Sequence, residues 1–579
     1  MEVPRQFDGV FTWLDWSVVV AYLVLTTLIG ARMAAGGRAT IRDFFLGGRR
    51  LVWWAVCGSI IATEVSAATF VAIPVLSFAD GGNYAYLQLA VGSIIARLLI
   101  ACYFVPRFYE REIYSPYDYM GQRLGDGVKK VTTALFFVGA ILGQGARVFI
   151  TAFVLSTIAR IDLVTAIWAI GLFSVAWTLL GGITTVIWTD FIQFFVLLCG
   201  ALVALGTAVA TVPGGVDQVI YAASSAEKFG VLDARRDFSI PYTIWCGLIA
   251  APFLNLAAFG TDQVMAQRMF CCRNARDAQK AIVWSAVSVF MAITMLTVGV
   301  ALYAHFLHHP FSTAEQALYD RDKTYLLPMF IVRGIPQGLR GLIVAAVFAS
   351  AVSTLDSTLA ALSQTTLSAF LRRGEVRRGR RPRSWRDRLP ADIALSKILV
   401  VIWGVVLCAF AVLCIRIKDQ YANTIDLALG LVGYTYGPLL GAFLLAFVPG
   451  KRSHVGLAWS VPLAMLTVFG VSQHDWTVVA PVLGALDVTD LIVWLAAALY
   501  LVLGFVRLNA DVPKLAALTA GVIAMLLLHR LTLGADESGD AKYLAYPWVY
   551  PIGTLVTFGV GMALGAPTAR PSKDTRRKT

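Results

Sequence analysis

Polar side chains interrupt an apolar stretch at residues 51 to 79, and they are the first that could do chemistry. Its middle carries Ser59, Thr63, Glu64, Ser66 and Thr69. An acid inside a membrane span costs at least about 2.5 to 3.5 kcal/mol unless it meets a partner, an ion or water. Small and polar neighbours also let a helix unwind and turn carbonyls toward a cation. The pattern favours an ion or solute site over helix packing through small residues, the alternative.

A second polar group lies in the apolar stretch at residues 339 to 371. The segment FASAVSTLDSTLAALSQ contains Ser350, Ser353, Thr354, Asp356, Ser357 and Thr358. At helical spacing Ser350, Ser353 and Ser357 share one face, with Thr354 on its edge. Hydroxyl and carbonyl oxygens suit a hard monovalent cation. A polar seam between helices explains this segment equally well.

Asp190 stands in the segment GGITTVIWTDFIQ, residues 181 to 193. Two glycines close one apolar stretch there, and the acid falls early in the next helix. A helix dipole favours an acid in that place, so a capping role is the plain interpretation.

Two arginines, Arg97 and Arg147, lie inside apolar stretches, where a permanent cation is expensive. Three roles are open for Arg147: contact with an anionic solute, an ion pair with Glu64, or snorkelling toward an interface. A structural role is expected for Arg97.

These residues must be positioned by membrane-spanning helices. The chain has 579 residues, of which 58% are hydrophobic and 14% are charged. A soluble protein would carry about 25% charged residues, so soluble and disordered classes are excluded. Apolar stretches long enough to span lie at about 16–34, 51–79, 84–106, 131–158, 162–180, 185–212, 240–262, 280–304, 339–371, 394–417, 425–448, 453–473, 488–507, 513–533 and 545–566.

The net charge of +13 is explained by membrane topology. With the N-terminus outside, 33 of the 48 Lys and Arg fall on the cytoplasmic side and 13 outside. The strongest element is the segment 372–388, with nine arginines, which predicts a topology anchor near anionic lipid rather than a nucleic-acid site. We therefore expect a multi-pass protein of the plasma (inner) membrane with a cytoplasmic C-terminus.

Other chemistry is disfavoured. The eight Cys show no disulfide framework or zinc spacing, and the six His lie in loops or near span ends, so we do not expect an enzyme. The first apolar stretch predicts a retained helix rather than a cleaved signal. A solute sensor without transport would be expected to carry an appended soluble domain, and none is evident. No obligate protein partner is expected.

Together with Asp262-Gln263 and Gln267-Arg268 in GTDQVMAQR, these motifs resemble the sodium:solute symporter family over residues 12 to 450. The resemblance implies an all-α membrane protein of the leucine-transporter type, with 13 to 15 transmembrane helices. Its parts would be a lead helix and basic loop (1–50), a first inverted repeat (51–212), an external loop (213–239), a second repeat (240–448), additional helices (449–566) and a basic tail (567–579).

The resemblance also implies two sodium sites. The principal site would take carbonyls from Ala62, Val65 and Ser350 and hydroxyls from Ser353 and Thr354. A second site, found in some members, would use Asp190, Asp356 and Ser357. Asp356 departs from the hydroxyl pattern, which leaves the ion stoichiometry open.

The solute site is implied in the same way. Gln88 and Asn255 fall where sugar-transporting members contact hydroxyls, but Gln88 replaces an acid and the lysine of the next helix is missing. Arg147 stands where carboxylate-carrying members place an arginine. The expected solute-binding residues are therefore Thr63, Glu64, Ser66, Thr69, Gln88, Arg147 and Asn255.

The sequence thus predicts a sodium-coupled symporter that imports a small solute, with a carboxylate favoured, by alternating access. Proton coupling through Glu64 and a sugar or amino-acid solute are the alternatives within the fold. A solute sensor without net transport is the alternative from another class.

Overall fold

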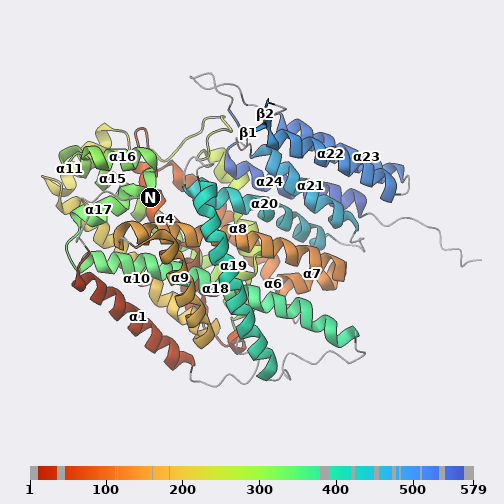
Figure 1. Ribbon diagram of the computed structural model, residues 1–579, viewed down its shortest axis with the longest axis horizontal. Coiled ribbons are helices and arrows are strands. Elements are labelled where there is room, and N and C mark those ends of the chain that lie inside the picture. Colours follow the sequence, from red (N-terminus) through yellow and green to blue (C-terminus); the bar gives the residue numbers. More distant parts are fainter. Residues whose placement is uncertain are drawn as a thin grey trace, which may run out of the picture.

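A computed structural model describes residues 11–34, 46–110, 113, 115–159, 161–181, 183–377, 390–418, 424–448, 455–472, 477–480, 484–508, 511–531, 533 and 542–565. Helices dominate this part of the chain (Figure 1). The described strands are β1 (Thr477–Ala480) and β2 (Gly484–Asp487), which form an antiparallel hairpin with Thr477 opposite Asp487.

The helices up to residue 225 form a lead helix and a first group of spans. Their bounds are α1 Trp13–Ala34, α3 Trp53–Glu64, α4 Ala67–Phe78, α5 Gln88–Leu99, α6 Val105–Tyr109, α7 Pro116–Leu124, α8 Asp126–Ala159, α9 Leu163–Gly181, α10 Ile183–Ala210 and α11 Gly215–Ser225, with the short turns η2 Gly47–Arg49, η3 Ala85–Leu87 and η4 Ile100–Phe104.

The second group extends to residue 447. Its bounds are η5 Cys246–Ala250, α12 Ala251–Asn255, η6 Leu256–Thr261, α13 Gln263–Phe270, α14 Ala275–Trp284, η7 Ser285–Ser288, α15 Val289–His308, α16 Thr313–Arg321, η8 Lys323–Tyr325, α17 Leu326–Gly334, α18 Leu339–Arg377, α19 Pro390–Ile417 and α20 Thr424–Phe447. Beyond it lie α21 Val455–Val471, α22 Val488–Arg507, α23 Val512–His529, η11 Tyr546–Trp548 and α24 Val549–Leu564.

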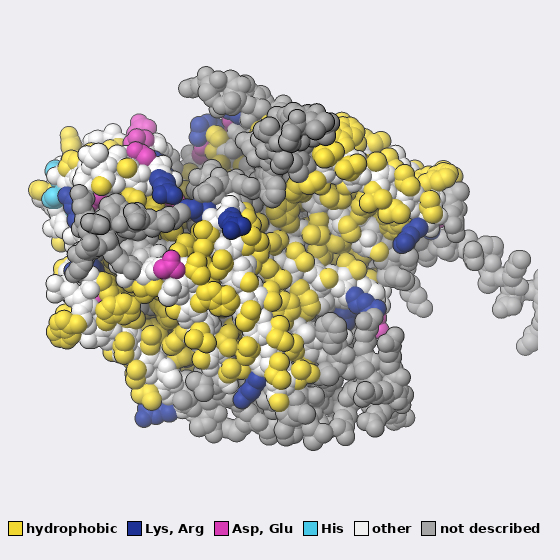
Figure 2. Space-filling model, viewed as in Figure 1, with side chains coloured by type: hydrophobic (Ala, Val, Ile, Leu, Met, Phe, Trp, Pro, Cys, Tyr) yellow, Lys and Arg dark blue, Asp and Glu magenta, His cyan; other side chains and the backbone are white. Residues whose placement is uncertain are grey.

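Membrane-spanning helices lie where the apolar stretches predict them. In the described residues eleven helices are long and apolar enough to cross a membrane, and two bent pairs raise the number to 13. Two shorter apolar helices, at 163–179 and 456–471, coincide with the remaining predicted stretches. Apolar side chains cover most of the face seen in Figure 2, with few charges between them, as a lipid-facing surface requires.

Each half of the core begins with a bent helix pair. The first pair, α3 and α4, bends by 61°, and the second, 246–261 and α13, bends by 56°. Four further spans follow each pair, ending with α10 in the first half and α20 in the second. This order is that of the leucine-transporter type, so the expected fold class is confirmed.

Some predictions fall outside the described residues. Most of the arginine-rich segment, at 378–389, and the basic tail from 567 onward lie there. One boundary prediction is wrong: the stretch at 240–262 was expected to end before Arg268, which was assigned to a cytoplasmic loop. The second bent pair instead continues to Phe270, and Arg268 is fully buried in the core.

Candidate functional site

The break between α3 and α4 exposes backbone oxygens at the centre of the core. Val65 (φ −77°, ψ 94°) and Ser66 (φ −93°, ψ 168°) are extended, so the helix ends at Glu64. The last helix-type hydrogen bond runs from the Val65 N–H to the Ile61 carbonyl. In a continuous helix, N–H groups one turn further along would donate hydrogen bonds to the carbonyls of Ala62 and Val65. The break removes these helical donors.

Helix α18 places its hydroxyl face against this break. Ser350 Oγ donates a hydrogen bond of 3.1 Å to the Val65 carbonyl, which fixes the register of the two elements. Thr354 Oγ1 is buried and has no hydrogen-bond partner among the described residues. A buried hydroxyl of this kind beside a helix break offers oxygen atoms of the type that a hard monovalent cation prefers. The five residues expected at the principal sodium site thus belong to the two elements that meet here.

Next to the break lies a buried cluster organised by Arg268 of α13. Its guanidinium forms an ion pair of 2.9 Å with Asp190 of α10 and donates to the hydroxyls of Thr63 and Ser357. Arg268 Nε also donates to Ser59 Oγ at 2.8 Å. Four helices, α3, α10, α13 and α18, therefore meet at one charged centre. The sequence motif GTDQVMAQR contained this residue, but its apparent loop position concealed its role.

The same cluster occupies the second candidate sodium site. Asp190 accepts hydrogen bonds from Ser59 Oγ at 2.5 Å and Ser353 Oγ at 2.6 Å in addition to the Arg268 pair. It is thus a buried acceptor between helices and not a helix cap. Asp356 Oδ1 accepts from the Ser357 N–H at 2.7 Å, while its Oδ2 is buried and has no hydrogen-bond partner in the described part of the chain. An internal guanidinium already bridges Asp190 and Ser357.

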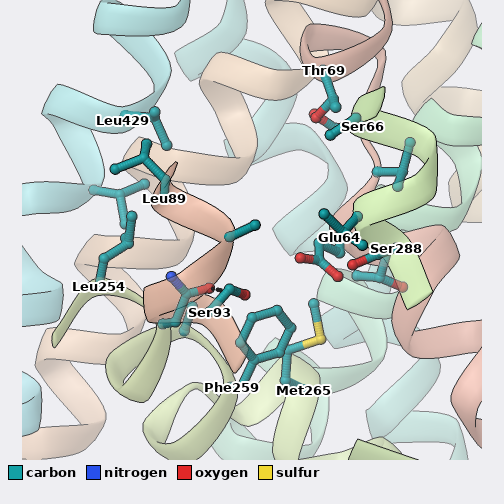
Figure 3. Close-up of a pocket in the computed structure, with 18 of the residues that line it drawn as sticks. Glu64, Ser66, Thr69, Leu89, Ser93, Leu254, Phe259, Met265, Ser288 and Leu429 are labelled. Atoms are coloured by element: carbon teal, nitrogen blue, oxygen red, sulfur yellow. Dashed lines mark hydrogen bonds between the residues drawn. The ribbon is translucent and has the colours of Figure 1, made fainter. Parts of the chain in front are cut away.

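A cavity of 250 Å³ opens beside the break. Six of the seven expected solute residues line it: Thr63 and Glu64 at the end of α3, Ser66 at the break, Thr69 in the first turn of α4, Arg147 of α8 and Asn255 of α12. Figure 3 shows Glu64 and Ser288 on one side of this cavity, with Leu89, Leu254 and Leu429 on the other.

Glu64 pairs with Arg97 on the cavity wall. The distance from Arg97 Nη2 to Glu64 Oε2 is 2.5 Å, and the exposed fractions of the two side chains are 2% and 27%. Arg97 also donates to Ser93 and to Ser285, and its guanidinium lies 4.3 Å from the Phe259 ring centroid. These contacts offset the free-energy cost of burying the Arg97 charge, as expected for a structural role. Glu64 is therefore the ion-pair partner of Arg97 and not of Arg147.

Arg147 has no such partner. It lines the cavity from α8, half-buried, and no hydrogen bond or ion pair joins its guanidinium to another described residue. Asp262 lies on the same cavity wall, but its carboxylate accepts from the Tyr436 hydroxyl and the Val264 N–H, each at 2.7 Å. The charges of Arg147 and Asp262 interact, but no ion pair joins the two side chains, so the guanidinium donors stay available to a carboxylate.

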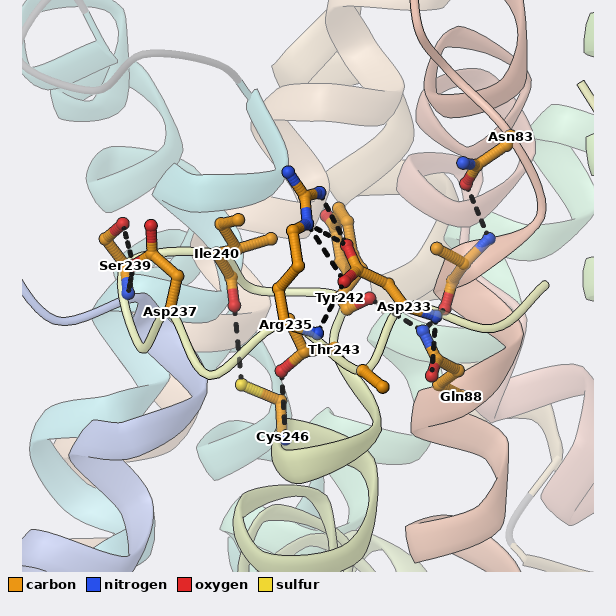
Figure 4. A network of polar contacts seen from close by, with 12 residues as sticks. Asn83, Gln88, Asp233, Arg235, Asp237, Ser239, Ile240, Tyr242, Thr243 and Cys246 are labelled. Carbon is orange, nitrogen blue, oxygen red and sulfur yellow. Dashed lines mark hydrogen bonds and ion pairs between the residues drawn. The ribbon is translucent and has the colours of Figure 1, made fainter. Parts of the chain in front are cut away.

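Asn255 and Gln88, both expected at the solute site, differ in where they lie. Asn255 faces the cavity and accepts a 2.9 Å hydrogen bond from Ser93 Oγ. Gln88 is not among the cavity-lining residues: its Nε2 donates to the Tyr242 carbonyl at 2.9 Å and its Oε1 accepts from the Asp233 N–H at 3.2 Å (Figure 4). It ties α5 to the loop before η5.

Comparison with known proteins agrees with this geometry. The profile of the sodium:solute symporter family matches residues 44–451. The chain is 27% identical to the sodium-coupled monocarboxylate transporter 2 of Bos taurus, over 79% of this chain and 73% of that protein. It is also 27% identical to the sodium/sialic acid symporter SiaT of Proteus mirabilis, over 77% and 87% of the two chains.

A solved structure shares the fold. It is the substrate-bound, outward-open state of a Na⁺-coupled sialic acid symporter, with a TM-score of 0.70 and 22% sequence identity, covering 96% of this chain and 99% of that one. The likeness extends to nearly the whole length of both chains.

Proposed function

This chain belongs to the sodium:solute symporter family, and from that premise we propose that it imports a carboxylate-bearing solute together with sodium. The family makes it a sodium-coupled transporter of small solutes and not an enzyme. The observation that supports a carboxylate is Arg147, a cavity-lining guanidinium that forms no ion pair or hydrogen bond with another described residue. A guanidinium can hold a carboxylate through two parallel hydrogen bonds.

Sodium would bind between the break and α18. There the Ala62, Val65 and Ser350 carbonyls and the Ser353 and Thr354 hydroxyls would surround one ion. Because the break also forms the cavity edge through Ser66 and Thr69, sodium at this position would stabilise the conformation that binds solute. The coupling is reciprocal: sodium and solute raise each other's affinity by the same factor.

We further propose one sodium per transport cycle. Arg268 supplies a fixed positive charge to Asp190 and hydrogen bonds to Ser357, which are two of the three groups of the second candidate site. A second sodium there would face this guanidinium at close range. Rocking of the two bent pairs against the surrounding helices would then expose the loaded site to each side in turn.

The protein is a multi-pass protein of the plasma membrane, and the distribution of Lys and Arg supports an outside N-terminus and a cytoplasmic C-terminus. Membrane lipid and the solute are its expected partners.

The experiment begins with a thermal-shift screen of carboxylates, amino acids and sugars with and without sodium, since a ligand of the folded state raises its melting temperature. Uptake of the best carboxylate is then measured in proteoliposomes against its neutral amide. We expect uptake of the carboxylate alone, driven by a sodium gradient and lost when choline replaces sodium at fixed pH.

The alternatives give different results. Uptake that follows an imposed pH gradient in choline would indicate proton coupling. Equal uptake of acid and amide, or selective uptake of a sugar, would refute the carboxylate assignment. Sodium-dependent binding without any uptake would indicate a sensor.

A further inference from the structure

One wall of the solute cavity is built by a residue beyond the region that matches the family profile. That region ends at residue 451, whereas Tyr546, the first residue of η11, lines the cavity together with Leu254 and Leu429. Leu254 and Tyr546 also pack against one small buried cluster, made of Val468, Val471, Val549 and Tyr550. The carboxy-terminal helices therefore contribute to the solute site.

Helix α24 holds this segment against the core through close backbone contact. On α20, Gly433, Gly437 and Gly441 recur every four residues on the face toward α24. A Cβ atom on Gly437 would lie 2.8 Å from the Tyr550 carbonyl oxygen, and one on Gly441 would lie 2.6 Å from that of Thr554. Small residues at this spacing let membrane helices approach closely. The C-terminal helix is thus packed as tightly as a core helix.

A hydrogen bond from α24 reaches the cavity wall directly. The Tyr550 hydroxyl donates to the Leu429 carbonyl at 2.8 Å, and Leu429 itself lines the cavity. Thr554 Oγ1 donates to the Gly437 carbonyl at 3.0 Å. These bonds fix the position of η11, which directly precedes α24.

The loop before η5 holds the segment from its other side. The Ala545 N–H donates to the Phe238 carbonyl at 3.0 Å, and the rings of Phe238 and Trp548 meet edge to face at 5.1 Å. Figure 4 shows that loop tied to α5 by Gln88 and braced by the Arg235–Asp233 pair, whose hydrogen bonds lower the pKa of the Asp233 carboxyl. Tyr546 is thus held in place by α24 on one side and by the loop before η5 on the other.

One side of the cavity carries three leucines. In Figure 3 Leu89, Leu254 and Leu429 lie away from Glu64 and Ser288, with Ser93 between the two groups. Tyr546 belongs to the side with the leucines, because it shares a packing cluster with Leu254 and sits four residues before Tyr550, which bonds to Leu429. Apolar side chains attract the hydrocarbon part of a solute.

We infer that Tyr546 is a specificity-determining residue that closes the leucine-lined side of the cavity and limits the length of the hydrocarbon chain on the solute. The inference rests on the proposed carboxylate function, in which Arg147 binds the carboxylate and the hydrocarbon part of the solute contacts Leu254, Leu429 and Tyr546. It assigns to the C-terminal helices a part in solute selection.

The test measures sodium-driven uptake of unbranched carboxylates from two to eight carbons by the wild type, Tyr546→Ala and Tyr546→Trp. Each newly buried methylene changes affinity about fourfold. We expect Tyr546→Ala to shift the KM ratio toward longer chains by about tenfold or more and Tyr546→Trp to shift it toward shorter ones, with unchanged sodium half-saturation. Tyr543→Ala is the matched control, because Tyr543 is 40% exposed and does not line the cavity.

An unchanged chain-length profile in both Tyr546 variants, or an equal shift in Tyr543→Ala, would overturn the inference and leave the proposed function intact. A wild type that imports no carboxylate refutes the proposed function instead. Modification of Tyr546→Cys by a maleimide in detergent then decides the inference: the solute found by thermal shift must slow it, and must not slow modification of Tyr543→Cys. Equal rates with and without solute would overturn it.

Discussion

Arg268 and Arg147 are both arginines within the membrane core, and their surroundings are opposite. Arg268 is fully buried, and its guanidinium forms an ion pair with Asp190 and donates hydrogen bonds to three hydroxyls and to the Val264 carbonyl. Arg147 is half-buried on a cavity wall and has no described hydrogen-bond or ion-pair partner. A buried charge whose three guanidinium nitrogens each donate a hydrogen bond holds helices together, whereas a guanidinium without an ion pair or hydrogen bond to a described residue is available to a ligand.

Arg97 lies between these two cases. Like Arg268 it is buried and paired, but its partner Glu64 is 27% exposed on the cavity wall. Burial depth alone therefore does not separate structural from functional arginines. The satisfaction of the guanidinium donors does.

The largest effect is expected from Arg268→Met. Removing one member of a buried ion pair costs about 3 to 5 kcal/mol, because the remaining charge is left uncompensated. We expect a much lower melting temperature and loss of uptake. The double variant Asp190→Asn, Arg268→Met should melt above the single variant, since Asp190 no longer carries a charge that has lost its partner. A single variant as stable as the wild type would show that Arg268 does not hold the helices together.

Arg147→Ala should separate function from stability. Losing a charged contact to a carboxylate costs about 2 to 5 kcal/mol, so kcat/KM for the anionic solute should fall at least about 30-fold. The melting temperature without solute should fall less than in Arg268→Met, because Arg147 forms no ion pair or hydrogen bond with another described residue and its loss deprives Asp262 only of a longer-range attraction. Arg147→Lys should recover part of the activity, since lysine keeps the positive charge but lacks the planar guanidinium that can bind both carboxylate oxygens. Arg416→Ala, at an exposed helix end, is the control, and unaltered solute affinity in Arg147→Ala would refute the assignment.

A smaller and more selective effect is expected from Thr354→Val. The change removes a buried hydroxyl that has no hydrogen-bond partner among the described residues. Losing one sodium ligand should raise the sodium half-saturation about tenfold, or about 1.4 kcal/mol. Thr358→Val is the matched control, because that hydroxyl donates to the Thr354 carbonyl of its own helix at 2.7 Å. Sodium titration of uptake should give a Hill coefficient near 1. Equal shifts in both variants would contradict a sodium role for Thr354.

The sequence was most informative where one segment alone carries the signal. The apolar stretches located every span, and polar residues around Glu64 indicated the break in the first bent helix. The second break was not recognised, because GTDQVMAQR reads as a polar loop when its neighbours are unknown. Arg268 consequently appeared to be a loop residue. Gln88 appeared to be a solute contact, although its amide holds a loop that lies 145 residues away along the chain.

By itself, the sequence determined the helical membrane class, the positions of the apolar stretches and the residue types available for sodium and solute. These follow from local hydrophobicity and composition, which need no knowledge of contacts. Only the tertiary structure decided the pairing of charges: Glu64 with Arg97, Asp190 with Arg268, and Arg147 with none. It also brought Tyr546 to the cavity. Such partners lie tens to hundreds of residues apart, and helix packing in three dimensions selects them.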